Sequence, residues 1–324
     1  MGVSGSEFSI IRRHFQLPDR SAPEWLRLGI GDDAALIEPP PGRLLVSTLD
    51  TLVSGRHFPE ATEAASIGWK ALAVNASDLV AMAADPAHFL LALTLPDDDD
   101  AWLERFADGL FRAADVFGMI LVGGDTTRGP LSVSIQANGW VDAGRAVTRS
   151  GARPGDRIWI SGRVGDAALA LRLLRGEVDA DRVDAATTAA CFTALNYPRP
   201  RIELIPLLRQ QASAAIDVSD GLAADLGHLL DASGVGAVIE GERLPVNRYL
   251  RDTDGFDLAL TGGDDYELLF TAPPEADAAL DAAARELPFA LTRIGSVTES
   301  GRHLVLDGRH RDLDDYRGYD HFRE

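Results

Sequence analysis

Short apolar segments alternate with helical apolar patterns along the whole chain, and this alternation is the feature that most constrains the fold. Residues 43–48 have the pattern of a strand, 62–84 that of a long helix, and 88–95 that of a second strand. The order recurs later, where a strand at 157–161 precedes a helix at 166–174. Such a chain packs helices against sheets, so the sequence predicts an α/β (α+β) protein.

A turn-rich stretch near the middle divides the chain into two parts. Residues 150–156 read SGARPGD, a composition that is typical of a connection between domains. The chain has 324 residues, enough for two domains of about 100–200 residues each. We therefore expect an N-terminal domain over residues 1–148 and a C-terminal α/β domain over 149–324.

The charge of the chain is strongly negative. It has 50 acidic residues against 31 basic ones, which gives a formal net charge of −19. Nucleic-acid phosphates repel such a chain, and no dense arginine cluster offsets the repulsion, so we expect no nucleic-acid partner. No apolar run approaches the ~18 residues of a membrane span, and the N-terminus lacks a signal-peptide pattern. We expect a cytoplasmic protein without a membrane partner.

Residue usage excludes several common mechanisms. Lys70 is the only lysine and no Gly-Lys-Ser/Thr tripeptide exists, so the chain has no Walker A phosphate loop. The His-Arg-Asp and Asp-Phe-Gly motifs of protein kinases are absent as well. Cys191 is the only cysteine, which excludes an intramolecular disulfide and a cysteine-based zinc cluster. We expect Cys191 to be a small buried apolar residue.

Five aspartates follow short apolar segments, where the chain is expected to leave a sheet: Asp33, Asp50, Asp125, Asp217 and Asp264. The segments before Asp125 and Asp264, residues 119–122 and 258–260, are expected to be strands. Ligand sites of α/β folds gather at strand ends, although a single aspartate there is more often a turn residue. Converging carboxylates repel one another unless cations neutralise them, and oxygen ligands without a His or Cys cluster favour Mg²⁺. Because Mg²⁺ completes its shell with substrate phosphates, the pattern predicts a multi-magnesium site for a phosphate-bearing substrate such as a nucleotide.

Asp78 lies inside the apolar pattern of the long helix. An uncompensated buried carboxylate is costly, so Asp78 should be paired, protonated or bound to a metal. A partner arginine and a metal ion explain it equally well at this stage, and Asn75 lies on the same helical face. The four acids at 97–100 differ, because they precede a helical run at 101–117 and suit its N-cap and first turn.

Arg149 stands at the expected domain junction. An arginine in such a cleft suits bidentate phosphate binding, although a surface ion pair is the usual role of an arginine elsewhere. His57 is one of seven histidines and indicates no chemistry by itself.

Nine segments of the chain resemble those of a known family and occur in order from one end to the other. They are GSEF (5–8), GIGDDAAL (29–36), STLDTLVSGRHF (47–58), WKALAVNASDLVAMAADP (69–86), LVGGDTTRGPLSVS (121–134), TRSGARPGD (148–156), IDVSDGLAADLGH (216–228), LTGGDDYELLF (260–270) and GYDHF (318–322). On these segments the chain resembles the thiamine-monophosphate kinases, which share a superfamily with aminoimidazole-ribonucleotide synthetase.

The resemblance implies direct in-line transfer of the γ-phosphoryl group of ATP to thiamine monophosphate, the last step of thiamine diphosphate biosynthesis. It also implies several Mg²⁺ ions and a two-domain fold of the aminoimidazole-ribonucleotide synthetase type. The N-terminal strands of two copies would pair in one barrel, so a homodimer is implied. No catalytic base is expected, because a phosphate oxygen is already anionic near neutral pH.

Carried over residue by residue, the resemblance implies three groups of ligands. The magnesium ligands would be Asp33, Thr48, Leu49 through its backbone carbonyl, Asp50, Asp78, Asp125, Asp217 and Asp220. The contacts to ATP would come from Gly124, Asp125, Arg149 and Ser219. The contacts to thiamine monophosphate would come from His57, Asp264 and Tyr319, whose ring suits stacking on an aromatic cation.

Two positions depart from the family pattern, and alternatives within the superfamily remain. Leu49 stands where relatives often have Thr, and Asp264 stands where Glu is common, which shortens the reach by one methylene. Selenophosphate synthetase and the hydrogenase-maturation dehydratase rely on cysteines that this chain lacks at the matching ends. Aminoimidazole-ribonucleotide synthetase is the strongest enzymatic alternative, and a nucleotide-binding protein without catalysis is the alternative from another class.

Overall fold

The computed structural model of the chain describes residues 7–16, 23–253 and 255–319. The segments at 5–8 and 318–322, which carry part of the family resemblance, therefore lie partly outside the described residues. Among the helices of the described ranges, none combines the length and the apolar character that a membrane crossing requires.

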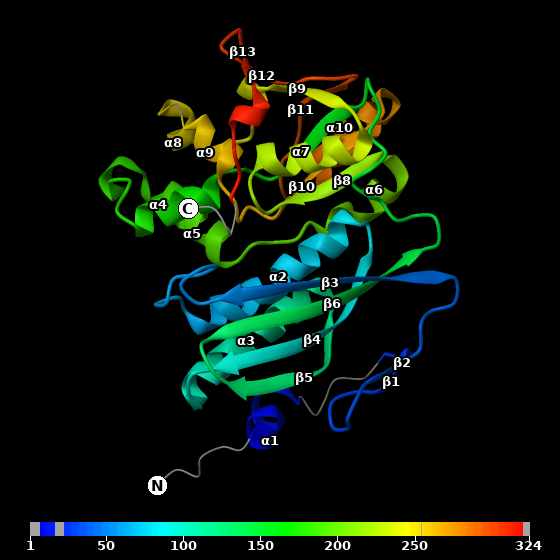
Figure 1. Cartoon of the computed structure of the whole chain (residues 1–324), viewed down its shortest axis with the longest axis vertical. Coiled ribbons are helices and arrows are strands. Elements are labelled where there is room, and N and C mark those ends of the chain that lie inside the picture. Colours follow the sequence, from blue (N-terminus) through cyan, green and yellow to red (C-terminus); the bar gives the residue numbers. More distant parts are fainter. Residues whose placement is uncertain (1–6, 17–22, 254, 320–324) are drawn as a thin grey trace. The chain divides into compact units, whose positions relative to one another are not determined.

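The chain separates into two compact units, each with its own sheet (Figure 1). Unit 1 contains Met1–Leu79 and Ala84–Gly144, and unit 2 contains Val80–Ala83 and Arg145–Glu324. The boundary between the two units near the middle of the chain thus lies between Gly144 and Arg145. The expected domain boundary between residues 148 and 149 stays a prediction. Strands and helices mix in both units, which confirms the predicted α/β (α+β) class.

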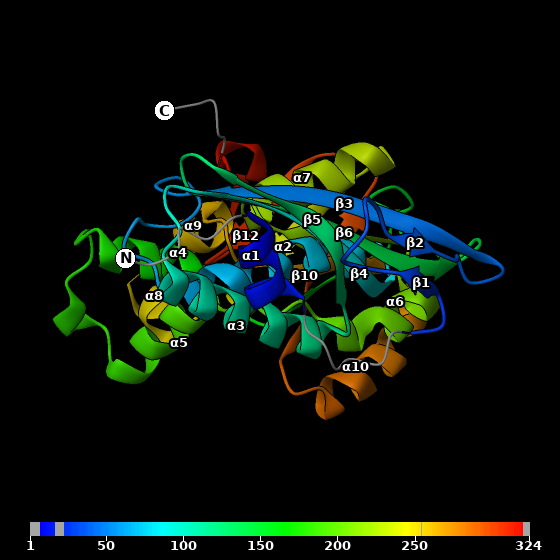
Figure 2. The ribbon, with the colours of Figure 1, turned by 90° about the horizontal axis from the view of Figure 1, so that it is seen from below.

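Unit 1 is built on a four-stranded sheet with the order β3-β6-β4-β5. Its strands are β3 (Arg43–Val53), β4 (Asp85–Leu95), β5 (Ile120–Arg128) and β6 (Ser132–Asp142). Helices α2 (Ala64–Ala81) and α3 (Asp100–Phe117) lie on one face of this sheet (Figure 2). The remaining elements are α1 (Glu7–Ile10), the π-helix η1 (Ile11–Phe15), and the two-stranded sheet of β1 (Leu26–Leu28) and β2 (Leu36–Ile37).

The two helices of unit 1 begin and end for local reasons. The Asp99 side chain accepts hydrogen bonds from the backbone N–H groups of Ala101 and Trp102, and Asp100 lies in the first turn, so the predicted N-cap and first-turn roles are confirmed for these two of the four acids. Helix α2 is shorter than the predicted 62–84. It ends before Ala83, whose φ of 54° is left-handed and turns the chain into β4.

Strands β3 and β5 continue further than predicted. The pairing of β3 with β6 runs to Val53, so Asp50 lies inside a strand and not at its end. Likewise β5 pairs with β4 throughout its length, so Asp125 is also inside a strand. The residue before Asp125 must be glycine, because a Cβ on Gly124 would lie 1.9 Å from the carbonyl oxygen of Leu91. The predicted strand-end position of these two aspartates is therefore wrong.

Unit 2 is built on a seven-stranded sheet with the order β13-β12-β9-β11-β7-β10-β8, in which only the pairing of β9 with β12 is parallel among the described pairs. Its strands are β7 (Arg157–Ser161), β8 (Ala214–Val218), β9 (Gly236–Glu240), β10 (Glu267–Ala272), β11 (Leu291–Thr298), β12 (Arg302–Leu306) and β13 (Arg309–Asp312). Its α-helices are α4 (Asp166–Leu174), α5 (Ala185–Asn196), α6 (Ile205–Gln211), α7 (Leu222–Ser233), α8 (Arg248–Asp252), α9 (Phe256–Thr261) and α10 (Asp277–Glu286).

The segment before Asp264 is a helix and not the predicted strand. Residues 258–260 lie within α9, so Asp264 follows a helix. A three-residue apolar run carries no periodicity that separates the two structures. Helix α9 ends at Gly262, where a Cβ would lie 2.4 Å from the Cβ of Ala168 in α4.

The sheet of unit 2 buries apolar side chains on both faces. Ile158 and Ile160 of β7 belong to a core cluster with residues of α4, α5 and α7. Trp159 between them belongs to a second cluster, with residues of α6 and α10. Cys191 is fully buried in the first cluster, and burial raises the pKa of its thiol to about 12. The expected role of Cys191 as a buried apolar residue is confirmed.

Helices α2 and α3 approach so closely that glycine is required at their contact. A Cβ on Gly109 would lie 1.8 Å from the carbonyl oxygen of Ala65, and one on Gly68 would lie 2.2 Å from that of Phe106. We expect Gly109→Ala to lower the free energy of unfolding by about 1–3 kcal/mol through overpacking, even though alanine is the better helix former. Urea unfolding measures the change.

Gly227→Ala in α7 is the matched control. The added Cβ would meet only the Arg302 Nη1 atom at 3.5 Å, an ordinary contact distance. This variant should be as stable as the wild type or more stable by up to about 1 kcal/mol. A Gly109→Ala protein as stable as Gly227→Ala would contradict the close approach of the two helices.

Candidate active site

The residues that the resemblance implies as ligands fall into two groups, one in each unit. Unit 1 carries Asp33, Thr48, Leu49, Asp50, His57, Asp78, Gly124 and Asp125. Unit 2 carries Arg149, Asp217, Ser219, Asp220, Asp264 and Tyr319.

Strand β3 and helix α2 hold the first cluster of unit 1. The Thr48 hydroxyl donates a short hydrogen bond to Asp78 Oδ2, so the carboxylate inside the apolar helix is paired with a hydroxyl. Beside it, Asn75 Oδ1 accepts the Asp50 N–H at 3.0 Å, and Asn75 Nδ2 donates to the carbonyl of Ala71 at 2.9 Å. Asn75 is fully buried and thus ties β3 to α2 at the level of Asp50.

Leu49 points to the opposite face of the sheet. Side chains alternate along a strand, so Thr48 and Asp50 face α2 while Leu49 lies on the other, open face with 63% of its surface exposed. Its side chain offers no ligand atom, which leaves only the backbone carbonyl for the implied metal contact.

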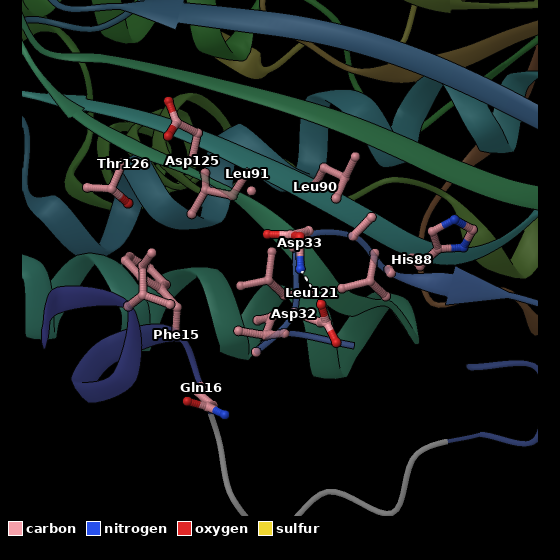
Figure 3. A pocket seen from close by; sticks show the side chains of 18 of the residues that line it. Phe15, Gln16, Asp32, Asp33, His88, Leu90, Leu91, Leu121, Asp125 and Thr126 are labelled. Carbon is pink, nitrogen blue, oxygen red and sulfur yellow. Dashed lines mark hydrogen bonds between the residues drawn. The ribbon is translucent and has the colours of Figure 1, made fainter. Parts of the chain in front are cut away.

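A cavity of about 1190 Å³ opens in unit 1 between η1, the segment around Asp33, and strands β4 to β6 (Figure 3). Its lining includes Asp33, Gly124 and Asp125, which come from segments far apart in the sequence. Asp32 Oδ1 accepts the Asp33 N–H at 2.8 Å and shapes the turn that presents Asp33. Both Asp33 and Asp125 are exposed, so their carboxylates are accessible to a ligand.

His88, which was not predicted as a site residue, lines the same cavity. Its ring lies between those of Trp25 and Trp140, with centroid distances of 5.4 and 5.8 Å. The Nδ1 atom is buried and has no hydrogen-bond partner within the described part of the chain. Burial lowers the pKa of the imidazole. A single histidine in an apolar strand gives no sequence signal of this environment.

The remaining unit 1 residue, His57, shapes the turn after β3. Its Nδ1 atom accepts the Val53 N–H at 3.0 Å. No three acidic, histidine or cysteine side chains gather into a metal cage within residues 7–16, 23–253 and 255–319. The predicted carboxylates therefore do not form a preassembled metal centre among these residues.

The loop between β8 and α7 holds the first part of the unit 2 group. Asp225 Oδ2 accepts the N–H groups of Ser219 and Asp220, both at 3.0 Å. Burial raises the pKa of Asp225 to about 7, and the nearby Asp220 charge adds to this, whereas the two hydrogen bonds and Arg149 oppose it. Asp225 was not predicted as a site residue, although it lies in an apolar helical pattern of the kind that singled out Asp78.

Two other segments meet this loop through their backbones. The Asp264 N–H donates to the Ser219 carbonyl, and the Tyr319 N–H donates to the Asp220 carbonyl, both at 2.9 Å. The structure thus brings four of the six predicted unit 2 residues together.

The other two unit 2 residues are held by different contacts. Asp217 is buried in β8, in register opposite Leu268 of β10. Arg149 is exposed, and its backbone carbonyl accepts the Ser233 hydroxyl at 3.0 Å. This bond ties the start of unit 2 to the end of α7, while the guanidinium remains accessible to an anion.

Comparison with known proteins places the chain in a family. Residues 31–141 match the N-terminal domain of AIR synthase related proteins, and residues 153–307 match their C-terminal domain. The chain is 46% identical over 322 residues to the thiamine-monophosphate kinase of Escherichia coli, with 98% of both chains covered. The chain belongs to the thiamine-monophosphate kinase family. A Haemophilus influenzae member is 39% identical over 335 residues, again with 98% of both chains covered.

Solved structures of this family agree with the described fold. The thiamine-monophosphate kinase of Stenotrophomonas maltophilia is 48% identical, with a TM-score of 0.82 over 89% of this chain and 93% of that one. AaThiL, solved in complex with AMPPCP and TMP, is 34% identical, with a TM-score of 0.75 over 90% and 92% of the two chains. The family resemblance predicted from the sequence motifs is confirmed.

The buried His88 should make stability depend on pH. Because burial lowers the pKa of His88 in the folded chain, the unfolded chain binds the proton more tightly. The free energy of unfolding should therefore fall as the pH drops below about 6.5, the ordinary histidine pKa. His88→Phe keeps an aromatic ring between the two tryptophans and should remove this part of the pH dependence. Urea unfolding from about pH 7.5 to 5 tests it.

His303→Gln is the control, since this exposed histidine lies on β12 in unit 2. It should leave the wild-type pH dependence in place. The same slope of unfolding free energy against pH in wild type and His88→Phe would show that His88 does not titrate as its burial requires.

Proposed function

We propose that the chain transfers the γ-phosphoryl group of ATP to the phosphate of thiamine monophosphate, which yields thiamine diphosphate and ADP. The observation that carries this proposal is the 46% identity to a thiamine-monophosphate kinase over 98% of both chains. The complex of AaThiL with AMPPCP and TMP supports the assignment of the two substrates. A phosphate oxygen of the acceptor attacks the γ-phosphorus in line, the bond to the ADP oxygen breaks, and no general base is needed.

The donor chemistry of both groups fits Mg²⁺. Every side chain proposed as a magnesium ligand is a carboxylate or a hydroxyl, the hard oxygen donors that Mg²⁺ prefers. Mg²⁺ usually binds one or two carboxylates and completes its shell with water and substrate phosphates, so a preassembled three-residue cage is not required. The proposed ligands are Asp33, Thr48, the Leu49 carbonyl, Asp50, Asp78, Asp125, Asp217 and Asp220. When bound, the ions neutralise charge on the transferring phosphates.

The residues of the chain orient the two substrates. Gly124, Asp125, Arg149 and Ser219 contact ATP, with the accessible Arg149 guanidinium suited to a bidentate phosphate contact. His57, Asp264 and Tyr319 contact thiamine monophosphate. The Tyr319 ring is half exposed and can stack on the cationic heterocycle. Asn75 and Asp225 do not contact substrate in this proposal and instead hold the backbone at Asp50, Ser219 and Asp220.

Incubation of the purified protein with ATP, Mg²⁺ and thiamine monophosphate tests the proposal. Chromatography and ³¹P NMR should detect thiamine diphosphate and ADP in equal amounts, and chelation of the metal should stop both. Formylglycinamidine ribonucleotide in place of thiamine monophosphate should give no product. Turnover of that compound alone would favour an aminoimidazole-ribonucleotide synthetase, and ATP binding without any turnover would favour a binding protein.

Asp50→Asn and Asp125→Asn should each lower kcat by at least about a hundredfold, because each removes a negative ligand and keeps the side-chain shape. Thermal unfolding should remain that of the wild type. Asp108→Asn is the matched control, since Asp108 is an exposed aspartate of unit 1 that pairs with Arg112 on α3. Near-normal turnover in either of the first two variants would contradict the metal assignment.

We propose further that the protein is a homodimer in which the open face of the unit 1 sheet is covered by the same face of a second copy. Leu49 and Leu90 lie in register on either side of Gln136, and Leu45 shares their face. All three are exposed, with 54% of Leu45 and 63% of Leu49 accessible. Several large exposed leucines on one sheet face favour an interface between subunits.

Leu45→Arg should convert the dimer to a monomer, because the substitution places a charge in the proposed apolar interface. Light scattering after size-exclusion chromatography measures the mass in solution. Leu174→Arg is the matched control, since Leu174 is an equally exposed leucine, at 52%, on α4 of unit 2. A monomeric wild type, or a Leu45→Arg protein that remains dimeric, would contradict this interface.

A further inference from the structure

One serine hydroxyl makes three hydrogen bonds to the loop that carries Arg149. Ser233 is the last residue of α7, and its Oγ atom donates to the Arg149 carbonyl at 3.0 Å. The same atom accepts the N–H groups of Gly151 and Ala152, both at 3.2 Å. A hydroxyl has one proton and two lone pairs, so these bonds use its full capacity on one short segment of backbone.

The same loop also lies against the start of β8. The Ala215 N–H donates to the Thr148 carbonyl at 3.0 Å. Gly151 packs so closely that a Cβ there would lie 2.3 Å from the Ser213 carbonyl oxygen. Helix α7 returns alongside β8 within unit 2 (Figure 1), so the end of the helix and the start of the strand both hold this loop. The backbone on either side of Arg149 is therefore fixed at several points.

The opposite end of α7 holds Ser219, the other proposed ATP contact of unit 2. Asp225, in the first turn of the helix, accepts the Ser219 N–H at 3.0 Å. Asp225 and Ser233 lie eight residues apart, which is about 12 Å along the helix axis. The helix itself is held in place because its leucines are buried in the core of unit 2: Leu222, Leu226, Leu229 and Leu230. Helix α7 therefore sets the distance between the two anchored loops.

The side chain of Arg149 lies within electrostatic range of the Asp225 end of this helix. Burial raises the pKa of Asp225 to about 7, and the positive charge of Arg149 opposes the rise. The interaction between two charges weakens with distance, so the guanidinium lies near the carboxyl that holds the Ser219 loop. Because an exposed arginine has many rotamers, a fixed backbone limits where its guanidinium can reach.

We infer that Ser233 is a positioning residue for ATP, which holds the backbone of Arg149 at the distance from Ser219 that the nucleotide requires. This inference rests on the proposed function, in which Arg149 and Ser219 contact ATP. Arg149 and Gly151 are exposed, so water can replace the lost hydrogen bonds there without a large loss of stability. Water does not replace the fixed connection between the loop and the helix. Loss of the Ser233 hydroxyl therefore weakens nucleotide binding and leaves acceptor binding unchanged.

Ser233→Ala removes the hydroxyl and adds no new group. We expect the Kd for AMPPCP with Mg²⁺, measured by titration calorimetry, to rise about fivefold, the effect of one hydrogen bond. The KM for ATP should rise by the same factor, while kcat and the KM for thiamine monophosphate stay within about twofold of wild type. Thr298→Val is the matched control, because it removes another hydroxyl of unit 2 that donates to a backbone carbonyl, that of Ser300 at 3.1 Å. This control should change none of the four constants.

A double-mutant cycle with Arg149→Gln separates positioning from a general loss of stability. Arg149→Gln alone should weaken AMPPCP binding, and adding Ser233→Ala to it should change the Kd by less than about twofold, because Ser233 acts through Arg149. Fully multiplicative effects of the two substitutions, or an equal rise in the KM for thiamine monophosphate in Ser233→Ala, would overturn the inference. AMPPCP binding is measured without the acceptor, so a wild type that binds AMPPCP but does not phosphorylate thiamine monophosphate would contradict the proposed function alone.

Discussion

Repulsion between carboxylates is the constraint that the candidate site must satisfy before it can bind anything. The chain carries a net charge of −19, and most of its proposed magnesium ligands are aspartates. The structure places neutral donors beside acidic groups: the Thr48 hydroxyl on Asp78, and the Ser219 and Asp220 N–H groups on Asp225. Neutral donors stabilise a carboxylate without cancelling its charge, which the proposed binding of Mg²⁺ and of a cationic heterocycle requires.

Backbone contacts fix these donors and acceptors in place. In unit 1, α2 and α3 meet at Gly68 and Gly109, and the buried Asn75 ties α2 to β3. In unit 2, the segments that carry Asp264 and Tyr319 bind the β8–α7 loop through their N–H groups. Because close-packed backbones move less than exposed side chains, both groups of proposed ligands project from closely packed backbone.

Local patterns predicted some elements well and misplaced others for physical reasons. Helix α4 has the predicted bounds of 166–174, because its apolar periodicity spans the whole helix. Residues 258–260 were predicted as a strand and form part of α9, since so short a run has no period. Asp50 and Asp125 were expected at strand ends and lie within strands. The length of a strand depends on its partners, which are distant in the sequence.

The sequence by itself determined the α/β class and the family, because each motif is local and the motifs occur in order. It also proposed the acidic ligands. Only the tertiary structure decided which residues support those ligands. Asn75 holds Asp50 and Asp225 holds Ser219 through contacts between segments that no local pattern relates. The loop that carries Asp264 is left-handed at Asp264 and Tyr266, and the residues that hold it, Val218, Ser219 and Gly165, are distant in the sequence.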